Sequence, residues 1–262
     1  MQEKEFGFAS RMTDIFKKRL PEVRLVVFDE TDSTNTRAKL AADKADGTDT
    51  FFIAKRQTGG RGRLGRSFLS EEGGLYLSYL CYPSLPATDA IRLTAYAAVC
   101  LCETLAAHTP LSPKIKWVND CFVGDKKLAG ILTEGGFSQD GSHFDYAVVG
   151  IGVNLSRVDF GEGLSDIATD VESECGVLPD ICEIAASLAE RLVGFSSADP
   201  SEYMKKYRNL SLVMGRRVRV ICPSGDYFAT VTDMDGCGAL TVTLDSGEVR
   251  TVLSGEVSLK LN

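Results

Sequence analysis

The pattern of hydrophobic and polar residues divides the chain into a long mixed part and a short strand-rich part. Apolar residues at helical spacing predict helices over residues 9–20, 34–46, 87–107, 179–195 and 200–210. Short apolar or alternating runs predict strands over 24–28, 51–54, 75–82, 115–117, 127–134 and 144–150. Four short strand patterns end the chain, over 218–222, 227–231, 240–244 and 249–253. We therefore expect an α+β fold, with a body over 1–212 and a small β-barrel over 213–262.

The composition narrows the class of protein. Hydrophobic residues make up 44% of the 262 residues and charged residues 25%, which is ordinary for a globular chain. The net charge of −7 is opposite in sign to that of a protein that binds phosphate backbones, so we expect no nucleic-acid partner. The longest strongly apolar stretch, 93–102, is much shorter than the ~20 residues that span a bilayer, so we also expect no membrane association.

The cysteines give information about the compartment. The eight of them form no Cys-x-x-Cys pair and no spacing typical of a zinc or redox site. The first twenty residues lack the apolar segment of a secretion signal. We therefore expect reduced, mostly buried thiols, a cytoplasmic location and no dedicated metal site.

A segment rich in arginine and glycine is the sharpest chemical feature. Residues 56–66 contain four arginines and four glycines, directly after a predicted strand. Glycine allows close backbone approach, and guanidinium groups bind phosphate or carboxylate oxygens in a bidentate manner. The segment matches neither a Walker A loop nor a dinucleotide fingerprint. We interpret it as an anion-binding loop, whereas the alternative is a solvated basic turn.

Other polar residues lie where strands and helices are expected to end. A predicted turn between Asp120 and Lys127 would bring these two residues close together, with Asn119 beside them. Each also has a structural interpretation, since Asp120 is suited to capping a turn and Lys127 to the surface. The hydroxyls of residues 32–35 fit a helix N-cap or a ligand contact, and Gly150 and Gly152 fit a tight turn or a strand end close to a ligand.

The residues of nucleophilic catalysis are missing from the sequence. The two histidines, His108 and His143, fall at a predicted helix end and in a polar loop, and no Gly-x-Ser-x-Gly motif occurs. An enzyme with this sequence would act by positioning its substrates and stabilising charge rather than through a nucleophile of its own.

Six segments, in order, resemble biotin protein ligases from about residue 24 to the C-terminus. They are Asp32-Ser33-Thr34-Asn35, Gly60-Arg61-Gly62-Arg63-x-Gly65-Arg66, Lys116-Trp117-x-Asn119-Asp120, Lys127-Leu128-Ala129-Gly130-Ile131-Leu132, Gly150-Ile151-Gly152-Val153-Asn154 and Gly255-Glu256-Val257-Ser258-Leu259. The resemblance implies a mixed sheet flanked by helices, similar to class II aminoacyl-tRNA synthetases, with a C-terminal SH3-like barrel. It also implies a reaction in which biotin and MgATP give biotinyl-5′-adenylate, and a lysine of a biotin carboxyl carrier protein then attacks.

The resemblance assigns roles to individual residues. It implies that biotin and its acyl phosphate contact Ser33, Thr34, Asn35, Gln57, Gly60, Arg61, Gly62, Arg63, Lys127, Gly150 and Gly152. Arg63, Asp120 and Lys127 would be catalytic, and Asp120 would orient or deprotonate the incoming lysine. Phe68, Asn119, Asn154 and Lys260 would lie near the nucleotide, together with Glu256. Metal is expected only as the Mg²⁺ that accompanies ATP.

The sequence departs from the family pattern at two positions. Phe68 stands where the family commonly has Trp, and Val118 stands where it commonly has Pro. Only about twenty-two residues precede the first predicted strand, which is too few for the winged helix-turn-helix of family members that also act as repressors. We therefore expect a monofunctional ligase that does not bind operator DNA. A homodimer is compatible with the sequence.

Two other functions stay open at the level of the sequence. A lipoate or octanoate ligase would share the fold, although the paired Arg-Gly-Arg-x-Gly-Arg and Lys-Leu-Ala-Gly motifs favour biotin. A biotin-binding module without turnover would not need the charges of Arg61, Arg63, Asp120 and Lys127.

Overall fold

The computed structural model describes residues 7–44, 47–157, 159–222, 225–253 and 255–259. The helices are α1 (Phe8–Arg19), α2 (Thr34–Ala42), α3 (Ala90–His108), α4 (Val171–Cys175), α5 (Ile181–Val193) and α6 (Pro200–Leu210). The first seven strands are β1 (Arg24–Thr31), β2 (Thr50–Gln57), β3 (Leu75–Cys81), β4 (Lys114–Lys116), β5 (Asp120–Val123), β6 (Lys126–Phe137) and β7 (Phe144–Val153). The last five are β8 (Arg217–Ile221), β9 (Tyr227–Met234), β10 (Leu240–Thr243), β11 (Val249–Val252) and β12 (Glu256–Ser258).

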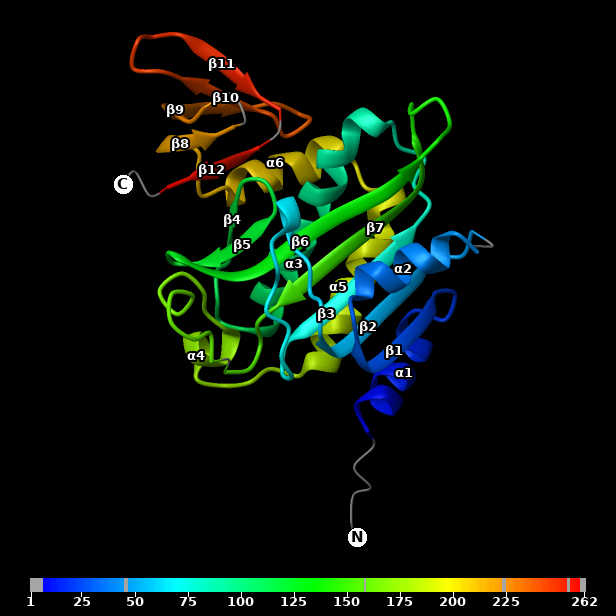
Figure 1. Ribbon diagram of the computed structural model, residues 1–262. Coiled ribbons are helices and arrows are strands. Elements are labelled where there is room, and N and C mark those ends of the chain that lie inside the picture. The colour runs from blue at the N-terminus through cyan, green and yellow to red at the C-terminus, as the bar shows by residue number, and fades with distance from the viewer. Residues whose placement is uncertain (1–6, 45–46, 158, 223–224, 254, 260–262) are drawn as a thin grey trace.

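The first seven strands form one mixed sheet, in the order β1-β2-β3-β7-β6-β5-β4. Strands β1 and β2 are parallel and the other neighbours are antiparallel, so the predicted mixed sheet flanked by helices is confirmed. Helices α1, α3 and α5 pack together on one face, whereas α2 packs on β2, β3 and β7 from the other face (Figure 1).

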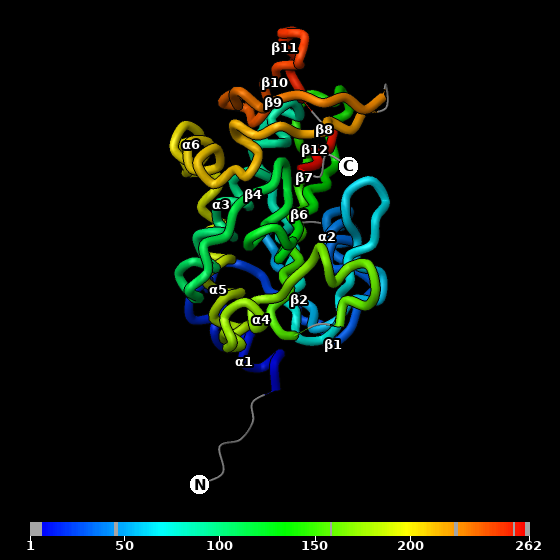
Figure 2. The backbone as a smooth tube through the Cα atoms, turned by 90° about the vertical axis from the view of Figure 1, so that its left-hand side faces the viewer, coloured from blue at the N-terminus to red at the C-terminus, as the bar shows by residue number. Residues whose placement is uncertain are grey.

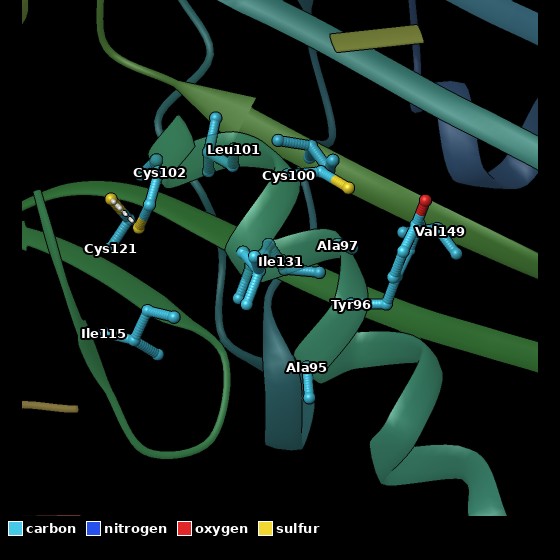
Figure 3. Packing of buried hydrophobic residues seen from close by; sticks show 14 of the residues in the cluster. Ala95, Tyr96, Ala97, Cys100, Leu101, Cys102, Ile115, Cys121, Ile131 and Val149 are labelled. Carbon is cyan, nitrogen blue, oxygen red and sulfur yellow. Dashed lines mark hydrogen bonds between the residues drawn. The ribbon is translucent and has the colours of Figure 1, made fainter. Parts of the chain in front are cut away.

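Helix α3 forms the centre of the core. Its side chains pack over Ile131 and Val149 of the sheet (Figure 3). Residues 87–108 are long and apolar enough to cross a membrane, but 67% of the apolar window is buried inside the protein, as in the core helix of a globular fold. The Sγ atoms of Cys102 and Cys121 lie 3.7 Å apart within this core.

None of the eight cysteines forms a disulfide bond in the described part of the chain, and five are buried, as the sequence predicts. Burial raises the pKa of Cys100 to about 12, so this thiol stays protonated at neutral pH. His108 ends helix α3, also as predicted.

The last five strands form a separate antiparallel sheet, in the order β11-β10-β9-β8-β12. It lies beside α6 at one end of the molecule, while α1 lies toward the other end (Figure 2). The predicted barrel is open: within the described residues, β11 and β12 are the sheet edges and do not pair with each other. The two sheets are joined by a hydrogen bond of 2.8 Å from Trp117 Nε1 to the carbonyl oxygen of Gly238.

Several boundaries differ from the predicted ones. Helix α2 ends at Ala42, before the predicted end at 46, and Gly47 follows with a positive φ of 76°. Strands β5 and β12 were not predicted, because each has only three or four residues and lacks a clear alternation.

Candidate functional site

The paired strands β6 and β7 form the floor of the candidate site, and this floor depends on glycine residues. In the antiparallel pair β6 and β7, Gly130 faces Gly152 and Leu132 faces Gly150. A Cβ atom on Gly150 would lie 1.9 Å from Oδ1 of Asn35, and one on Gly152 would lie 2.6 Å from the ring of Phe68. The glycines therefore let side chains from α2 and from residues 56–68, here called the arginine loop, lie directly on the sheet.

Polar side chains close one end of this floor. Thr34 and Asn35 begin helix α2 and are 3% and 4% exposed. The backbone N–H and the hydroxyl of Thr34 lie 2.8 and 3.0 Å from Oε1 of Gln57, which ends β2. Oγ of Ser78 on β3 lies 2.7 Å from Oγ1 of Thr34 and 2.6 Å from Oδ1 of Asn35. Within the described residues, the Ser33 side chain does not cap the helix, so the predicted N-cap bond is not made.

Sequence reasoning missed one carboxylate behind these residues. Glu134 on β6 accepts hydrogen bonds from Asn35 Nδ2 at 3.0 Å and from Lys39 Nζ at 2.6 Å, and its Oε1 lies 3.9 Å from Arg61. Burial alone would raise the pKa of Glu134, but the bonds from Lys39 and Asn35 outweigh it and lower the pKa. Only its odd position in an apolar strand, seven residues after Lys127, marked it in the sequence.

The arginine loop is a narrow hairpin above the floor. Arg61 and Ser67 form an antiparallel bridge, and the Phe68 N–H donates to the carbonyl oxygen of Gly60 at 2.9 Å. A Cβ on Gly60 would lie 2.3 Å from the Phe68 carbonyl oxygen, so only glycine lets the two arms of the hairpin come this close. Gly60 does not line the cavity that lies under the loop, which is described below. Arg56 forms ion pairs with Glu30 and Glu71 outside the site, so three of the four arginines, not all four, line the cavity.

Two of these arginines contact the C-terminal sheet. Arg63 donates to Asn119 Oδ1 at 3.1 Å and to the carbonyl oxygen of Gly255 at 3.0 Å. Arg66 donates to both carboxylate oxygens of Glu256, at 3.0 and 2.7 Å. This bidentate pair lowers the pKa of Glu256, chiefly through the hydrogen bonds from Arg66.

The predicted cluster of Asn119, Asp120 and Lys127 is formed. Lys127 Nζ lies 2.7 Å from Asp120 Oδ1 and 5.9 Å from the centre of the Phe68 ring. Asn119 is fixed from the other side, because its Nδ2 donates to the carbonyl oxygen of Ile131 at 2.7 Å. The turn that leads into this cluster contains a cis peptide bond between Trp117 and Val118. Val118 stands where the family commonly has Pro, and the bond before it is cis all the same.

These groups surround one cavity of about 120 Å³. Among the residues predicted for the site, its lining contains Ser33, Thr34, Asn35, Gln57, Arg61, Gly62, Arg63, Phe68, Asn119, Asp120, Lys127, Gly150 and Gly152. Five basic side chains line it, namely Arg61, Arg63, Arg66, Lys116 and Lys127, against the two carboxylates of Asp120 and Glu256. The cavity therefore has an uncharged hydrogen-bonding end and a cationic end, which suits a ligand with a polar head and an anionic tail.

A second cavity of about 720 Å³ adjoins the first and shares Arg66, Asp120, Lys127 and Glu256 with it. Its other wall is apolar and comes from Phe122, Phe160, Leu164, Ile167 and Ala168, none of which was predicted. Apolar residues in the otherwise polar stretch 156–168 were the available signal. Asn154 lines this second cavity, with its Nδ2 donating to the Thr169 carbonyl oxygen at 3.0 Å, while Lys260 lies outside the described residues.

Sequence comparison finds relatives over most of the chain. The Biotin/lipoate A/B protein ligase family matches residues 27–154, and the Biotin protein ligase C terminal domain matches residues 213–260. A biotin--[acetyl-CoA-carboxylase] ligase of Mycobacterium tuberculosis is 31% identical over 247 residues, which cover 89% of this chain and 88% of the relative. The bifunctional ligase/repressor BirA of Bacillus subtilis is 28% identical over 242 residues, covering 90% of this chain and 74% of the relative.

Structure comparison gives the same family. The biotin protein ligase from Aquifex aeolicus, solved in complex with biotin and ATP, is 29% identical with a TM-score of 0.74. The match covers 90% of this chain and 97% of the Aquifex chain. The matched regions include both sheets, and the chain is a member of the biotin protein ligase family.

Proposed function

We propose that this chain activates biotin with ATP and transfers it to a lysine of a biotin carboxyl carrier protein. In the first step a carboxylate oxygen of biotin attacks the α-phosphorus of ATP, the bond to pyrophosphate breaks, and biotinyl-5′-adenylate forms. In the second step the lysine amine attacks the acyl carbon, the bond to AMP breaks, and the amine loses a proton. The observation that carries this proposal is the cavity with a neutral polar end and a cationic end.

The neutral end is suited to the ureido ring of biotin. Thr34 and Asn35 supply buried hydrogen-bonding groups there, and the half-buried Gln57 supplies another. The glycines at 150 and 152 let Asn35 and Phe68 lie against the sheet. Lipoate and octanoate carry no N–H group at the corresponding end and would leave buried polar groups without partners, which costs affinity. This favours biotin over the two other acids.

The cationic end is suited to the first step. A carboxylate and a triphosphate repel each other, and Arg61, Arg63 and Lys127 line the space in which they would meet. Mg²⁺ would enter with ATP, held mainly by its phosphates, because within the described residues no group of three or more His, Cys, Asp or Glu is close enough to hold a metal ion. The apolar wall of the second cavity gives the adenine ring a surface on which to pack.

The second step needs an acceptor for the lysine proton. Asp120 lies at the boundary of the two cavities, paired with Lys127, and is our candidate for orienting or deprotonating the incoming amine. We assign 1–212 to the catalytic domain and 213–262 to the C-terminal domain. The five buried cysteines, none of them in a disulfide bond, support a reducing compartment such as the cytoplasm.

One assay tests the first step against its alternatives. ATP–pyrophosphate exchange is measured with biotin, lipoate and octanoate as the only acid. Exchange that depends on biotin is the expected result. Exchange with lipoate or octanoate alone would assign the chain to a different acid, and binding of biotin without exchange would identify a binding module.

A further inference from the structure

A continuous row of hydrogen bonds crosses the neutral end of the cavity. Between the amides of Asn35 and Gln57 lie only two hydroxyls, those of Ser78 and Thr34. The three successive contacts in this row measure 2.6, 2.7 and 3.0 Å. Ser78 is fully buried and Thr34 is 3% exposed, so the row is shielded from bulk water.

The amide groups at both ends of the row have a fixed orientation. Asn35 Nδ2 donates to the Leu132 carbonyl oxygen at 3.2 Å and to Glu134 Oε2 at 3.0 Å, so its Oδ1 must face Ser78. Ser70 donates its hydroxyl proton to the Phe68 carbonyl oxygen at 3.0 Å and therefore accepts from Gln57 Nε2 at 2.9 Å. Gln57 Oε1 consequently faces Thr34.

Both amides thus present oxygen atoms to the two hydroxyls. Three contacts need three protons, but the hydroxyls of Ser78 and Thr34 supply two. The backbone N–H of Thr34 also donates to Gln57 Oε1, at 2.8 Å. When the two hydroxyls donate toward Asn35, Gln57 Oε1 therefore keeps one acceptor site that the described groups of this row do not fill. An open acceptor site on Gln57, which lines the cavity, favours a ligand that brings an N–H group.

We propose that Glu134 is the positioning residue that sets this preference, an inference that rests on the proposed function. Glu134 does not line the cavity and does not contact the two hydroxyls; its partners are Asn35, Lys39 and, at 3.9 Å, Arg61. It acts through Asn35, because its carboxylate takes one amide proton and keeps the amide oxygen turned toward Ser78. If the amide turned over, its NH₂ group would donate to Ser78, and both hydroxyls would donate toward Gln57. The Thr34 hydroxyl would then fill the acceptor site on Gln57 Oε1 that the ligand's N–H needs.

The variant Glu134→Gln tests this role. Its new amide has a single acceptor oxygen, which the charged Lys39 attracts, so that an NH₂ group faces Asn35 and favours the turned amide. We expect KM for biotin in pyrophosphate exchange to rise roughly tenfold, as expected for one mismatched hydrogen bond to a buried site. We expect kcat and KM for ATP to change less than about twofold. KM does not depend on the folded fraction, so partial unfolding would not imitate this result.

Two other variants complete the design. Glu71→Gln removes a carboxylate that pairs with Arg56 outside the cavity and should leave KM for biotin unchanged. Lys39→Met removes the partner of Glu134 but keeps the bond from Asn35, and should also leave it nearly unchanged. An unchanged KM in Glu134→Gln, or an equal rise in Lys39→Met, would overturn the proposal. Absence of biotin-dependent exchange in the unaltered chain would instead refute the proposed function.

Discussion

Replacing Gly150 by alanine is the most direct test of the glycine floor. The added methyl group would lie 1.9 Å from Asn35 Oδ1, whereas an ordinary contact is 3.4–4 Å. Asn35 cannot simply move aside, because Leu132 and Glu134 hold its Nδ2 and Ser78 holds its Oδ1. Relief therefore requires either breaking the bond to Ser78 or displacing β7. Overpacking of a filled site costs about 1–3 kcal/mol.

This cost is expected to appear mainly in biotin binding, since Asn35 and Gly150 both line the cavity. A loss of about 2 kcal/mol corresponds to a roughly 30-fold increase in Kd. The affinity is measured by isothermal titration with biotin, and KM by pyrophosphate exchange. Gly236→Ala is the matched control, because a Cβ there meets no atom within 4 Å. A Kd within twofold of the unaltered chain in Gly150→Ala would refute the geometry of the floor.

Three further predictions concern the cationic end. Lys127→Ala should lower the single-turnover rate of adenylate formation by at least about tenfold, since it removes a cation beside the reacting groups; an equal rate would count against its role. Arg63→Ala should release the adenylate faster, because it frees the loop from Asn119 and Gly255; unchanged retention on a rapid spin column would contradict this. The pair of Glu256 and Arg66 should persist as the pH falls to the ordinary pKa of 4.5 and open only below it, because the pKa of Glu256 in the folded chain is lowered. Glu256→Gln should therefore increase hydrogen exchange of the loop even at pH 7, and the surface variant Glu248→Gln should not; equal exchange in both variants would argue against the contact.

Much of this architecture could be predicted from the sequence. The apolar residues of α3 and the short apolar runs of β3 and β7 predict these elements because burial dominates their residue choice. The alternation expected for 75–82 does not describe β3, in which all seven residues are buried. The polar segments were also informative, since Asp120 and Lys127 meet as the predicted turn requires.

The contacts that cross between distant elements could not be predicted. Glu134 lies close to Asn35 only because α2 packs on β7 beside β6, a consequence of strand order that no local pattern contains. The pairing of Arg56 with Glu30 and Glu71 likewise depends on the neighbouring strand and the loop end, so the charge alone indicated anion binding. The apolar wall of the second cavity comes from a segment without a regular period.

The contacts of Arg63 and Arg66 with the C-terminal sheet have a thermodynamic consequence. Gly255 and Glu256 hold in place two of the cations that would bind an incoming phosphate. An anion that draws these arginines inward must compete with the Gly255 carbonyl oxygen for Arg63 and with the Glu256 carboxylate for Arg66, and its net affinity is reduced by the strength of those contacts. By reciprocity, such an anion weakens the attachment of the C-terminal sheet by the same factor as the sheet weakens its binding. The affinity of the cavity for an anion and the stability of the contact between the two sheets are then linked by a single coupling free energy.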